Sequence, residues 1–295
     1  MPAVTGPDGR TIEYAVAGAA GSGDPCLVFH HGQPGAALIH DDLVRAAARH
    51  RLGVVMLSRP GYGGSSRQPG RRIASAASDT RVVLDHLGAG WFVAAGWSGG
   101  GPHALACGAL LAPRCRGVAS IAGVAPYVEG GDLDWTAGMG PENVAEFTGM
   151  ISGDPAVEGQ VVELCAELAA IRADQLADAL GGLISAPDRS ALQSGAALYM
   201  AEWMRRSASS GHYGYWDDGQ AFIAPWGFRL PDVAVPVQVW VAGQDLMVPP
   251  AHGEWLAAHI PGADKIQLQD EGHISLLTGH IGDIVDRLAR AAGPV

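Results

Sequence analysis

Short apolar runs alternate with longer amphipathic stretches through the first part of the chain. The apolar runs cover residues 26–30, 54–57, 92–95 and 118–122. Between them, residues 39–50, 73–87 and 102–111 carry apolar side chains at helical spacing. Near the N-terminus, residues 11–16 alternate after Pro7-Asp8-Gly9 and predict one strand of a hairpin. Apolar strands that alternate with helices predict an α/β fold, with a mostly parallel sheet covered by helices on both faces.

The strand pattern stops near residue 126 and resumes at residue 237. The interval holds helical patterns around residues 144–151, 157–171 and 189–207. A loop of this length is uncommon in a compact domain. We therefore predict a helical lid, residues 126–230, inserted into a core formed by residues 1–125 and 231–295. The rest of that core is predicted as strands at 237–242 and 265–268, and helices at 250–259 and 275–292.

The candidate nucleophile lies in Gly96-Trp97-Ser98-Gly99-Gly100, between a predicted strand and a predicted helix. In that setting G-x-S-x-G places a serine on a sharp elbow above the end of the strand. Three backbones approach one another there, so the residues two before and two after the serine must be small, and both are glycine. Glycine is abundant in this chain, 42 of 295 residues, so the motif alone is a weak signal. Its position between strand and helix makes Ser98 the candidate, against the alternative of an idle serine in a glycine-rich turn.

A serine nucleophile needs a base, and the base needs an orienting acid. For a serine at such an elbow, the expected order along the chain is Ser, then Asp or Glu, then His. His273 follows the predicted strand 265–268, and Asp245 follows the predicted strand 237–242, so both lie at carboxyl ends of strands. The rival residues lie within predicted helices or after the strand 118–122: His103, His259, His280, Glu129, Asp132 and Asp134.

The oxyanion of a tetrahedral intermediate needs preorganised donors. The backbone N–H of Gly99, directly after the serine, is one expected donor. The second should come from the turn after the strand 26–30, where His31-Gly32-Gln33-Pro34-Gly35 is rich in small residues. We predict that the N–H of Gln33 supplies it; the alternative is an ordinary tight turn.

The composition narrows the class of protein. A net charge of −11 disfavours nucleic acid as a partner. The short basic run from Arg67 to Arg72 is interpreted as a solvated helix start. Four cysteines without metal-like spacing predict free thiols in a reducing compartment. No secretory signal and no apolar run of membrane-spanning length is visible. We therefore expect a cytoplasmic protein, with no membrane partner, whose oligomeric state, monomer or homodimer, is open.

These motifs together resemble the α/β-hydrolase superfamily, over nearly the whole chain. HGQPG is similar to the HGxP oxyanion turn of epoxide hydrolases, haloalkane dehalogenases and related esterases, and RPGYGGSS to the glycine loop after the next strand. GWSGG matches the elbow, AGQDLMVP the acid loop and EGH the histidine loop. The resemblance implies an eight-stranded sheet, a Ser98–Asp245–His273 triad, Gln33 and Gly99 at the oxyanion hole, and no metal or organic cofactor. Epoxide hydrolases and haloalkane dehalogenases carry aspartate at the elbow, so the serine argues against their chemistry.

The predicted function is a serine hydrolase that cleaves an uncharged ester, lactone, thioester or amide. We expect an apolar or aromatic small-molecule substrate held by Trp97 and Gly32 of the core and by Trp216 and Trp226 of the lid. Packing within the lid is the alternative role of those tryptophans. Other uses of the fold stay open: a proline iminopeptidase-like enzyme, a carbon–carbon bond hydrolase, an acyltransferase, a cofactor-free oxygenase or a ligand-binding protein.

Overall fold

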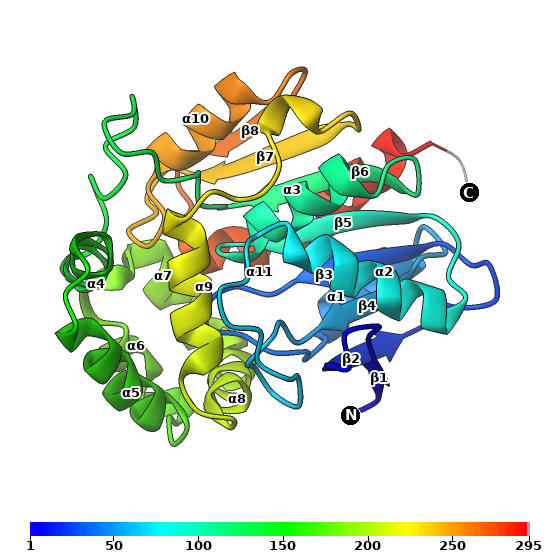
Figure 1. The fold of residues 1–295 in the computed structure, drawn as a ribbon. Coiled ribbons are helices and arrows are strands. Elements are labelled where there is room, and N and C mark those ends of the chain that lie inside the picture. The colour runs from blue at the N-terminus through cyan, green and yellow to red at the C-terminus, as the bar shows by residue number, and fades with distance from the viewer. Residues whose placement is uncertain (294–295) are drawn as a thin grey trace.

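The computed structural model describes residues 1–293 and contains an eight-stranded sheet in the order β1-β2-β4-β3-β5-β6-β7-β8 (Figure 1). At one edge, β1 (Ala3–Thr5) and β2 (Thr11–Ala17) pair antiparallel, and β2 is antiparallel to its neighbour β4. The remaining pairings are parallel and join β3 (Cys26–His30), β4 (Gly53–Leu57), β5 (Phe92–Trp97), β6 (Cys115–Ile121), β7 (Val237–Ala242) and β8 (Asp264–Leu268). The predicted α/β-hydrolase fold, with its mostly parallel sheet, is confirmed.

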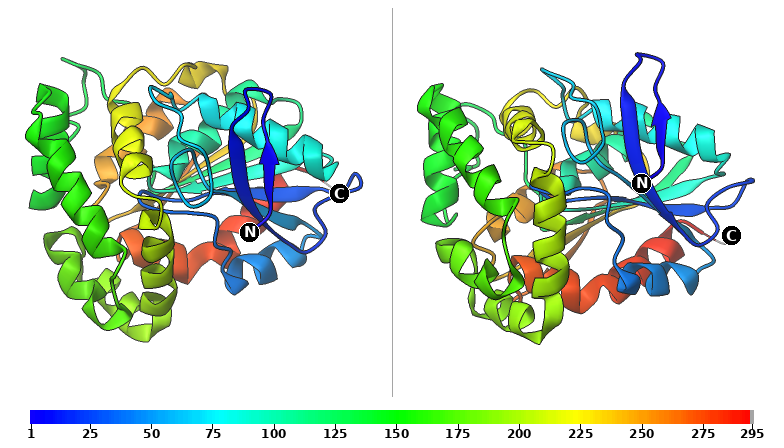
Figure 2. Two further views of the ribbon diagram at one scale, coloured as in Figure 1. Left: turned by 60° about the horizontal axis from the view of Figure 1, so that its bottom comes forward. Right: turned by 90° about the horizontal axis from the view of Figure 1, so that it is seen from below.

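Helices cover both faces of this sheet (Figure 2). On one face α1 (Asp41–Ala48) packs against α11 (His273–Ala291), and on the other α2 (Ser75–Leu87) packs against α3 (Gly100–Leu110). α10 (Pro250–His259) packs against β7 and β8. Every residue of β3, β4 and β5 is buried. Burial on both faces explains why these strands are continuously apolar rather than alternating.

Between β6 and β7 the chain forms only helices, which lie together at the end of the sheet where the parallel strands terminate (Figure 1). The α-helices of this segment are α4 (Pro141–Ser152), α5 (Ala156–Leu168), α6 (Leu176–Ala179), α7 (Ala186–Ala191), α8 (Ala197–Ala208) and α9 (Tyr213–Ile223). We refer to them as the α4–α9 segment. Their apolar faces join the same hydrophobic core as the sheet.

Three local features differ from the sequence-based expectation. The predicted helix 189–207 is two helices, because the π-helical turn Leu192–Ala196 contains Gly195 at φ +119°, outside the helical region. α9 was missed, since two glycines within YGYWDDGQAFI weaken its helical pattern. α11 begins at His273 rather than at residue 275, so the candidate base is the first residue of a helix instead of a loop residue.

Candidate active site

The serine elbow lies where β5 ends and α3 begins. Ser98 has φ +58°, a left-handed conformation that a non-glycine residue rarely adopts. Its N–H donates to the carbonyl of Ile121 at 2.8 Å, which ties the elbow to β6. A Cβ on Gly96 would overlap the backbone of Gly100, and a Cβ on Gly100 would overlap the carbonyl of His30. The close approach that the two glycines were expected to permit is therefore present.

His273, after β8, and Asp245, after β7, are in contact. His273 Nδ1 lies 2.7 Å from Asp245 Oδ2, and both side chains are buried. A carboxylate can only accept, so Nδ1 carries the proton and Nε2 is left free to accept one. The other carboxylate oxygen of Asp245 accepts the N–H groups of Met247 and Val248, both at 2.8 Å. The acid is thereby fixed on its loop after β7.

His273, the first residue of α11, is also held by Trp97, the residue before Ser98. The indole N–H of Trp97 donates to the carbonyl of His273 at 3.1 Å, and the two rings lie 4.9 Å apart, centroid to centroid. Ser98 and His273 line one cavity. The structure therefore brings all three residues of the expected triad to one place.

The rival residues have other partners. His103 Nδ1 lies 2.7 Å from the carbonyl of Gly99, and His280 Nε2 lies 2.9 Å from Glu271. His259 stacks on Trp255. The exposed carboxylate of Asp132 accepts the indole N–H of Trp255 at 2.7 Å, and Glu129 and Asp134 are also exposed. None of these six residues lines the cavity at Ser98, within the described part of the chain.

The expected oxyanion donors lie side by side. A Cβ placed on Gly99 would lie 3.3 Å from the Cβ of Gln33. Among residues 1–293, no protein acceptor is found for the backbone N–H of either residue. The side chain of Gln33 points elsewhere: its amide donates to the carbonyl of Tyr215 on α9 at 2.9 Å. Gly32 fits against the ring of Trp97, where a Cβ would lie 3.0 Å from Cε3.

A buried charge cluster, which the sequence analysis missed, supports the same turn. Arg59, after β4, donates through Nη2 to the carbonyl of Gly32 at 2.9 Å and through Nη1 to the carbonyl of His31. Its Nε donates to Asp218 of α9 at 3.0 Å. Asp218 is fully buried and also accepts from Tyr62 Oη at 2.9 Å and Arg71 Nη1 at 2.7 Å. This cluster connects the turn that carries Gln33 to the α4–α9 segment.

The interpretation of the basic run 67–72 as a solvated helix start is wrong for Arg71, and Arg67, which is partly exposed, has an acidic partner. Arg71 is only 6% exposed and pairs with Asp218. Arg67 Nε donates to Asp217 Oδ2 at 2.9 Å. The partners are about 150 residues away, on a helix that the sequence pattern did not reveal. The adjacent acids Asp217 and Asp218 were the only available signal.

The cavity at Ser98 has a volume of about 160 Å³ and is mostly apolar. Trp97, Trp135, Phe147 and Phe222 contribute aromatic rings to it. Its polar lining consists of a few side chains: Gln33, Ser98, Asn143, Glu167, Tyr215 and His273. The exposed Glu167 and Ala179 mark its rim between α5 and α6.

Two predicted substrate-binding tryptophans do not reach this cavity in the described structure. Trp216 is half-buried on α9, one residue after Tyr215, and therefore turned about 100° away from the side chain that does line it. Trp226 is buried beyond the end of α9, where its N–H donates to the carbonyl of Phe222 and its ring packs on Phe228. Gly32 lies behind Trp97 rather than on the cavity wall. Of the four predicted contacts, Trp97 alone lines the cavity.

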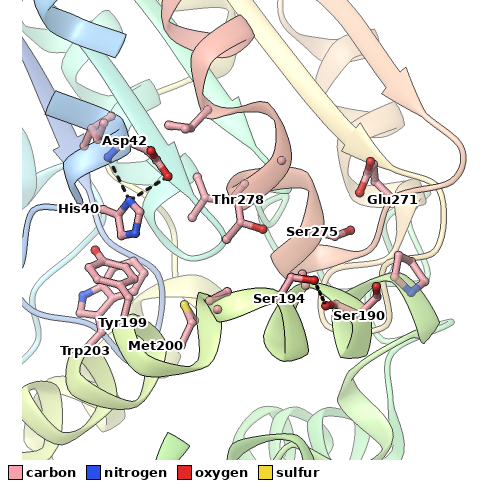
Figure 3. Close-up of a pocket in the computed structure, with 18 of the residues that line it drawn as sticks. His40, Asp42, Ser190, Ser194, Tyr199, Met200, Trp203, Glu271, Ser275 and Thr278 are labelled. Carbon is pink, nitrogen blue, oxygen red and sulfur yellow. Dashed lines mark hydrogen bonds and ion pairs between the residues drawn. The ribbon is translucent and has the colours of Figure 1, made fainter. Parts of the chain in front are cut away.

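A larger groove, drawn in Figure 3, shares a lining residue with this cavity. Its volume is about 670 Å³. One wall carries Ser190, Ser194 and Tyr199 of the α7–α8 region, and α11 contributes Ser275 and Thr278 on the other. His40 lies at one end, where its Nδ1 accepts the N–H of Asp42 at 3.2 Å, and Glu271 lies at the other. Met200 lines both the groove and the cavity at Ser98, so its side chain forms part of the partition between them.

The remaining reactive groups do not form a second centre. All four cysteines are free and buried, and burial raises the pKa of Cys26 and of Cys115 to about 12, which keeps them as thiols. Within residues 1–293 no group of three or more His, Cys, Asp or Glu side chains is arranged to hold a metal ion. The helices of that range are all too short or too polar to cross a membrane.

Comparison with known proteins gives the family. The family model described as "alpha/beta hydrolase fold" matches residues 25–280. The uncharacterized hydrolase YcgS of Bacillus subtilis (strain 168) is 35% identical over 80 residues, which cover 27% of this chain and 26% of that relative.

Two solved structures show the fold. The enol-lactonase from Burkholderia xenovorans LB400 matches with a TM-score of 0.70 at 20% identity, over 98% of this chain and 99% of that one. The bromoperoxidase from Bacillus anthracis matches with a TM-score of 0.67 at 22% identity, over 96% and 95%. The family match, the eight-stranded sheet and the serine elbow agree, and the chain belongs to the α/β hydrolase fold family.

Proposed function

We propose that this chain is a serine hydrolase that cleaves an uncharged ester, lactone, thioester or amide through an acyl-enzyme on Ser98. The observation that carries the proposal is the 2.7 Å contact between His273 Nδ1 and Asp245, in a site whose cavity also exposes Ser98 on a strained elbow. Such a pair leaves the second imidazole nitrogen free to take the serine proton.

The reaction then follows from the roles of these groups. Ser98 Oγ attacks the carbonyl carbon while its proton passes to His273 Nε2. The oxyanion accepts hydrogen bonds from the backbone N–H groups of Gln33 and Gly99. These two groups have no protein acceptor among the described residues. His273 returns the proton to the leaving group, and a water, activated in the same way, hydrolyses the acyl-enzyme. Asp245 orients the imidazole and stabilises its protonated form. No metal or organic cofactor is required.

The substrate should be a largely apolar small molecule. The cavity at Ser98 is lined by aromatic and aliphatic side chains, which favour an uncharged group. Its volume of about 160 Å³ is below the 300–1,000 Å³ of most small-molecule sites. The groove beyond Met200, at about 670 Å³, has room for a larger group. We therefore propose that residues 126–230 act as a lid, and that Met200 limits how far a long acyl or alcohol chain extends.

Covalent labelling tests the nucleophile directly. A fluorophosphonate should attach to Ser98, as located by mass spectrometry of the digested protein, and an activated aryl ester should give a burst if deacylation is slow. Ser98→Ala should remove both signals with little change in thermal stability. Ser152→Ala, an exposed serine of α4, is the matched control and should keep both.

The same experiment separates the alternatives. A ligand-binding protein would give no turnover, and its labelling would be slow and spread over several serines. The relation to a bromoperoxidase structure shows that the fold alone does not decide the chemistry. A cofactor-free oxygenase would consume oxygen and keep most of its activity in Ser98→Ala. Retention of most ester turnover by Ser98→Ala would therefore refute the acyl-enzyme mechanism.

A further inference from the structure

The first turn of α11, which begins with His273, is capped by a carboxylate from a distant part of the chain. Asp188 of α7 is fully buried. Its Oδ2 accepts the N–H of His273 at 3.2 Å, and its Oδ1 accepts the N–H groups of Ile274 at 2.7 Å and Ser275 at 3.0 Å. One side chain of the α4–α9 segment thus satisfies three of the N–H groups that a helix start leaves without partners.

α11 has no cap of its own that could do this. The residue before it is Gly272, where a side-chain cap would normally stand. A Cβ at Gly272 would lie 2.5 Å from Asp188 Cγ, so the glycine makes the approach of the carboxylate possible. Asp188 is itself held by Ser185, whose Oγ donates to Oδ2 at 3.1 Å. Gly272 and Asp188 therefore act together to fix the start of α11.

The charge of Asp188 also matters for the base. The N-terminus of a helix carries a partial positive charge, and His273 is the first residue of α11. The carboxylate bonded to the same N–H groups places a negative charge beside it. The other charged groups near His273 are Asp245, which is bonded to its ring, Glu167 of α5, which lines the same cavity, and Asp270 and Glu271 on the preceding loop. Glu271 pairs with His280.

We propose that Asp188 is a positioning residue for His273. It sets the orientation of the first turn of α11, and it supplies the negative charge that makes the imidazolium accessible during proton transfer. This inference rests on the proposed function, because it assigns Asp188 to the base of that reaction. It also couples the docking of α7 to the geometry of the base.

Asp188→Asn is the direct test, because it keeps the shape, removes the charge and replaces one of the two acceptor oxygens by an NH2 donor. We expect kcat for an activated ester to fall about 10- to 100-fold while KM changes by less than about threefold. The acid limb of the pH profile of kcat/KM should move to lower pH by about half to one unit, because the imidazole of the variant protonates only at lower pH. Asp188→Glu, which restores the charge on a longer side chain, should return the limb toward its original position.

Two further variants separate positioning from folding. Ser185→Ala leaves the carboxylate charged but loosens it, so kcat should fall a few-fold with no movement of the acid limb. Asp174→Asn removes the same charge from an exposed position of the α4–α9 segment that pairs only with Arg172, and it should change neither quantity. If Asp188→Asn does not fold, Ser185→Ala carries the test, and an unchanged kcat in that variant overturns the proposal.

The failure of this inference can be told from the failure of the proposed function. Nitrogen NMR of the His273 ring follows its protonation without turnover, and we expect Asp188→Asn to move that titration to lower pH even in a Ser98→Ala background. If Ser98→Ala keeps its turnover, the acyl-enzyme mechanism fails, and the NMR shift still decides the role of Asp188. If Asp188→Asn folds and keeps both its kcat and its titration, the proposal is wrong. A loss of kcat that only matches a reduced fraction of fluorophosphonate-reactive protein would also overturn it.

Discussion

Asp218→Asn tests the buried charge cluster behind the oxyanion turn. The wild-type carboxylate lies fully buried between the guanidinium groups of Arg59 and Arg71. The substitution leaves both cations buried without their counter-charge. Removal of one partner from a buried ion pair costs about 3–5 kcal/mol. Because Arg59 also holds the carbonyls of His31 and Gly32, we expect kcat to fall as well, by about tenfold, as the turn that carries Gln33 loosens.

The neighbouring residue provides the matched control. Asp217 is on the same helix and bonds to Arg67, but the Arg67 side chain is 33% exposed, so water can solvate the cation when the pair is broken. Asp217→Asn should therefore cost only about 1 kcal/mol. In thermal unfolding at pH 7 of a chain of 295 residues, these losses correspond to roughly 5–8 °C for Asp218→Asn and about 1–2 °C for Asp217→Asn.

The pH dependence provides a second check. Burial alone would raise the pKa of Asp218, but the guanidinium groups of Arg59 and Arg71 lower it well below its usual value. A lowered folded-state pKa stabilises the protein above the pKa of an unfolded aspartate, about 4, and this stabilisation is lost as the pH falls further. The wild type should therefore approach the stability of Asp218→Asn at acid pH. Equal losses in the two variants at pH 7, or an Asp218→Asn protein within 1 kcal/mol of wild type, would refute the reasoning.

Three further predictions address the site and the α4–α9 segment. Asp245→Asn should fold normally and lose roughly 10²–10⁴ in kcat, measured by ester hydrolysis; a near-normal kcat would assign the acid elsewhere. Burial raises the pKa of Glu146 to about 7, so its stabilising contribution fades as the pH rises from about 4.5 past 7. Glu146→Gln should accordingly raise the melting temperature at pH 8 more than at pH 5. Equal shifts at the two pH values would contradict a raised pKa of Glu146 in the folded protein. Met200→Trp should raise KM for long-chain esters and leave acetyl esters unchanged, as a chain-length series can show.

The features that could be predicted from the sequence are those that depend on residues close together in the chain. Buried parallel strands are continuously apolar, so β3, β4 and β5 were recognisable one by one. The elbow at Ser98 depends on glycines two residues away on each side, and the structure shows the backbone contacts that require them. His273 and Asp245 were selected by strand ends and chain order, and their side chains meet at 2.7 Å.

The missed features depend on contacts between distant segments. Asp188 reaches His273 across 85 residues, and Asp218 reaches Arg59 across 159. No local pattern reveals the distant partner of either acid, since a charge on a helix usually faces solvent. Trp216 and Trp226 were expected at the cavity from composition alone. The rotation of α9 turns Trp216 away from the cavity, and Trp226 lies beyond the end of that helix.

The buried carboxylates of Asp188 and Asp218 also limit the routes by which a substrate can reach Ser98. Lifting α9 would separate Asp218 from Arg59, and lifting α7 would separate Asp188 from the start of α11. Each movement leaves buried charges or N–H groups without partners, which costs about 1–3 kcal/mol for each group and more for a charge. By contrast, the exposed Glu167 and Ala179 already form the rim of the cavity between α5 and α6.

Access should therefore open between α5 and α6 while α7 and α9 stay docked. Amide hydrogen exchange can follow this opening, because it reports how often each segment separates from its neighbours. We expect the N–H groups of Ile274 and Ser275, which are bonded to Asp188, to exchange far more slowly than those of α6. An apolar substrate analogue should slow exchange in α5 and α6 and leave α7 and α9 unchanged. Faster exchange at Ile274 than in α6 would instead mean that α7 opens first. The first turn of α11, which carries the catalytic base, would then lose and regain its bonds to Asp188 in every catalytic cycle.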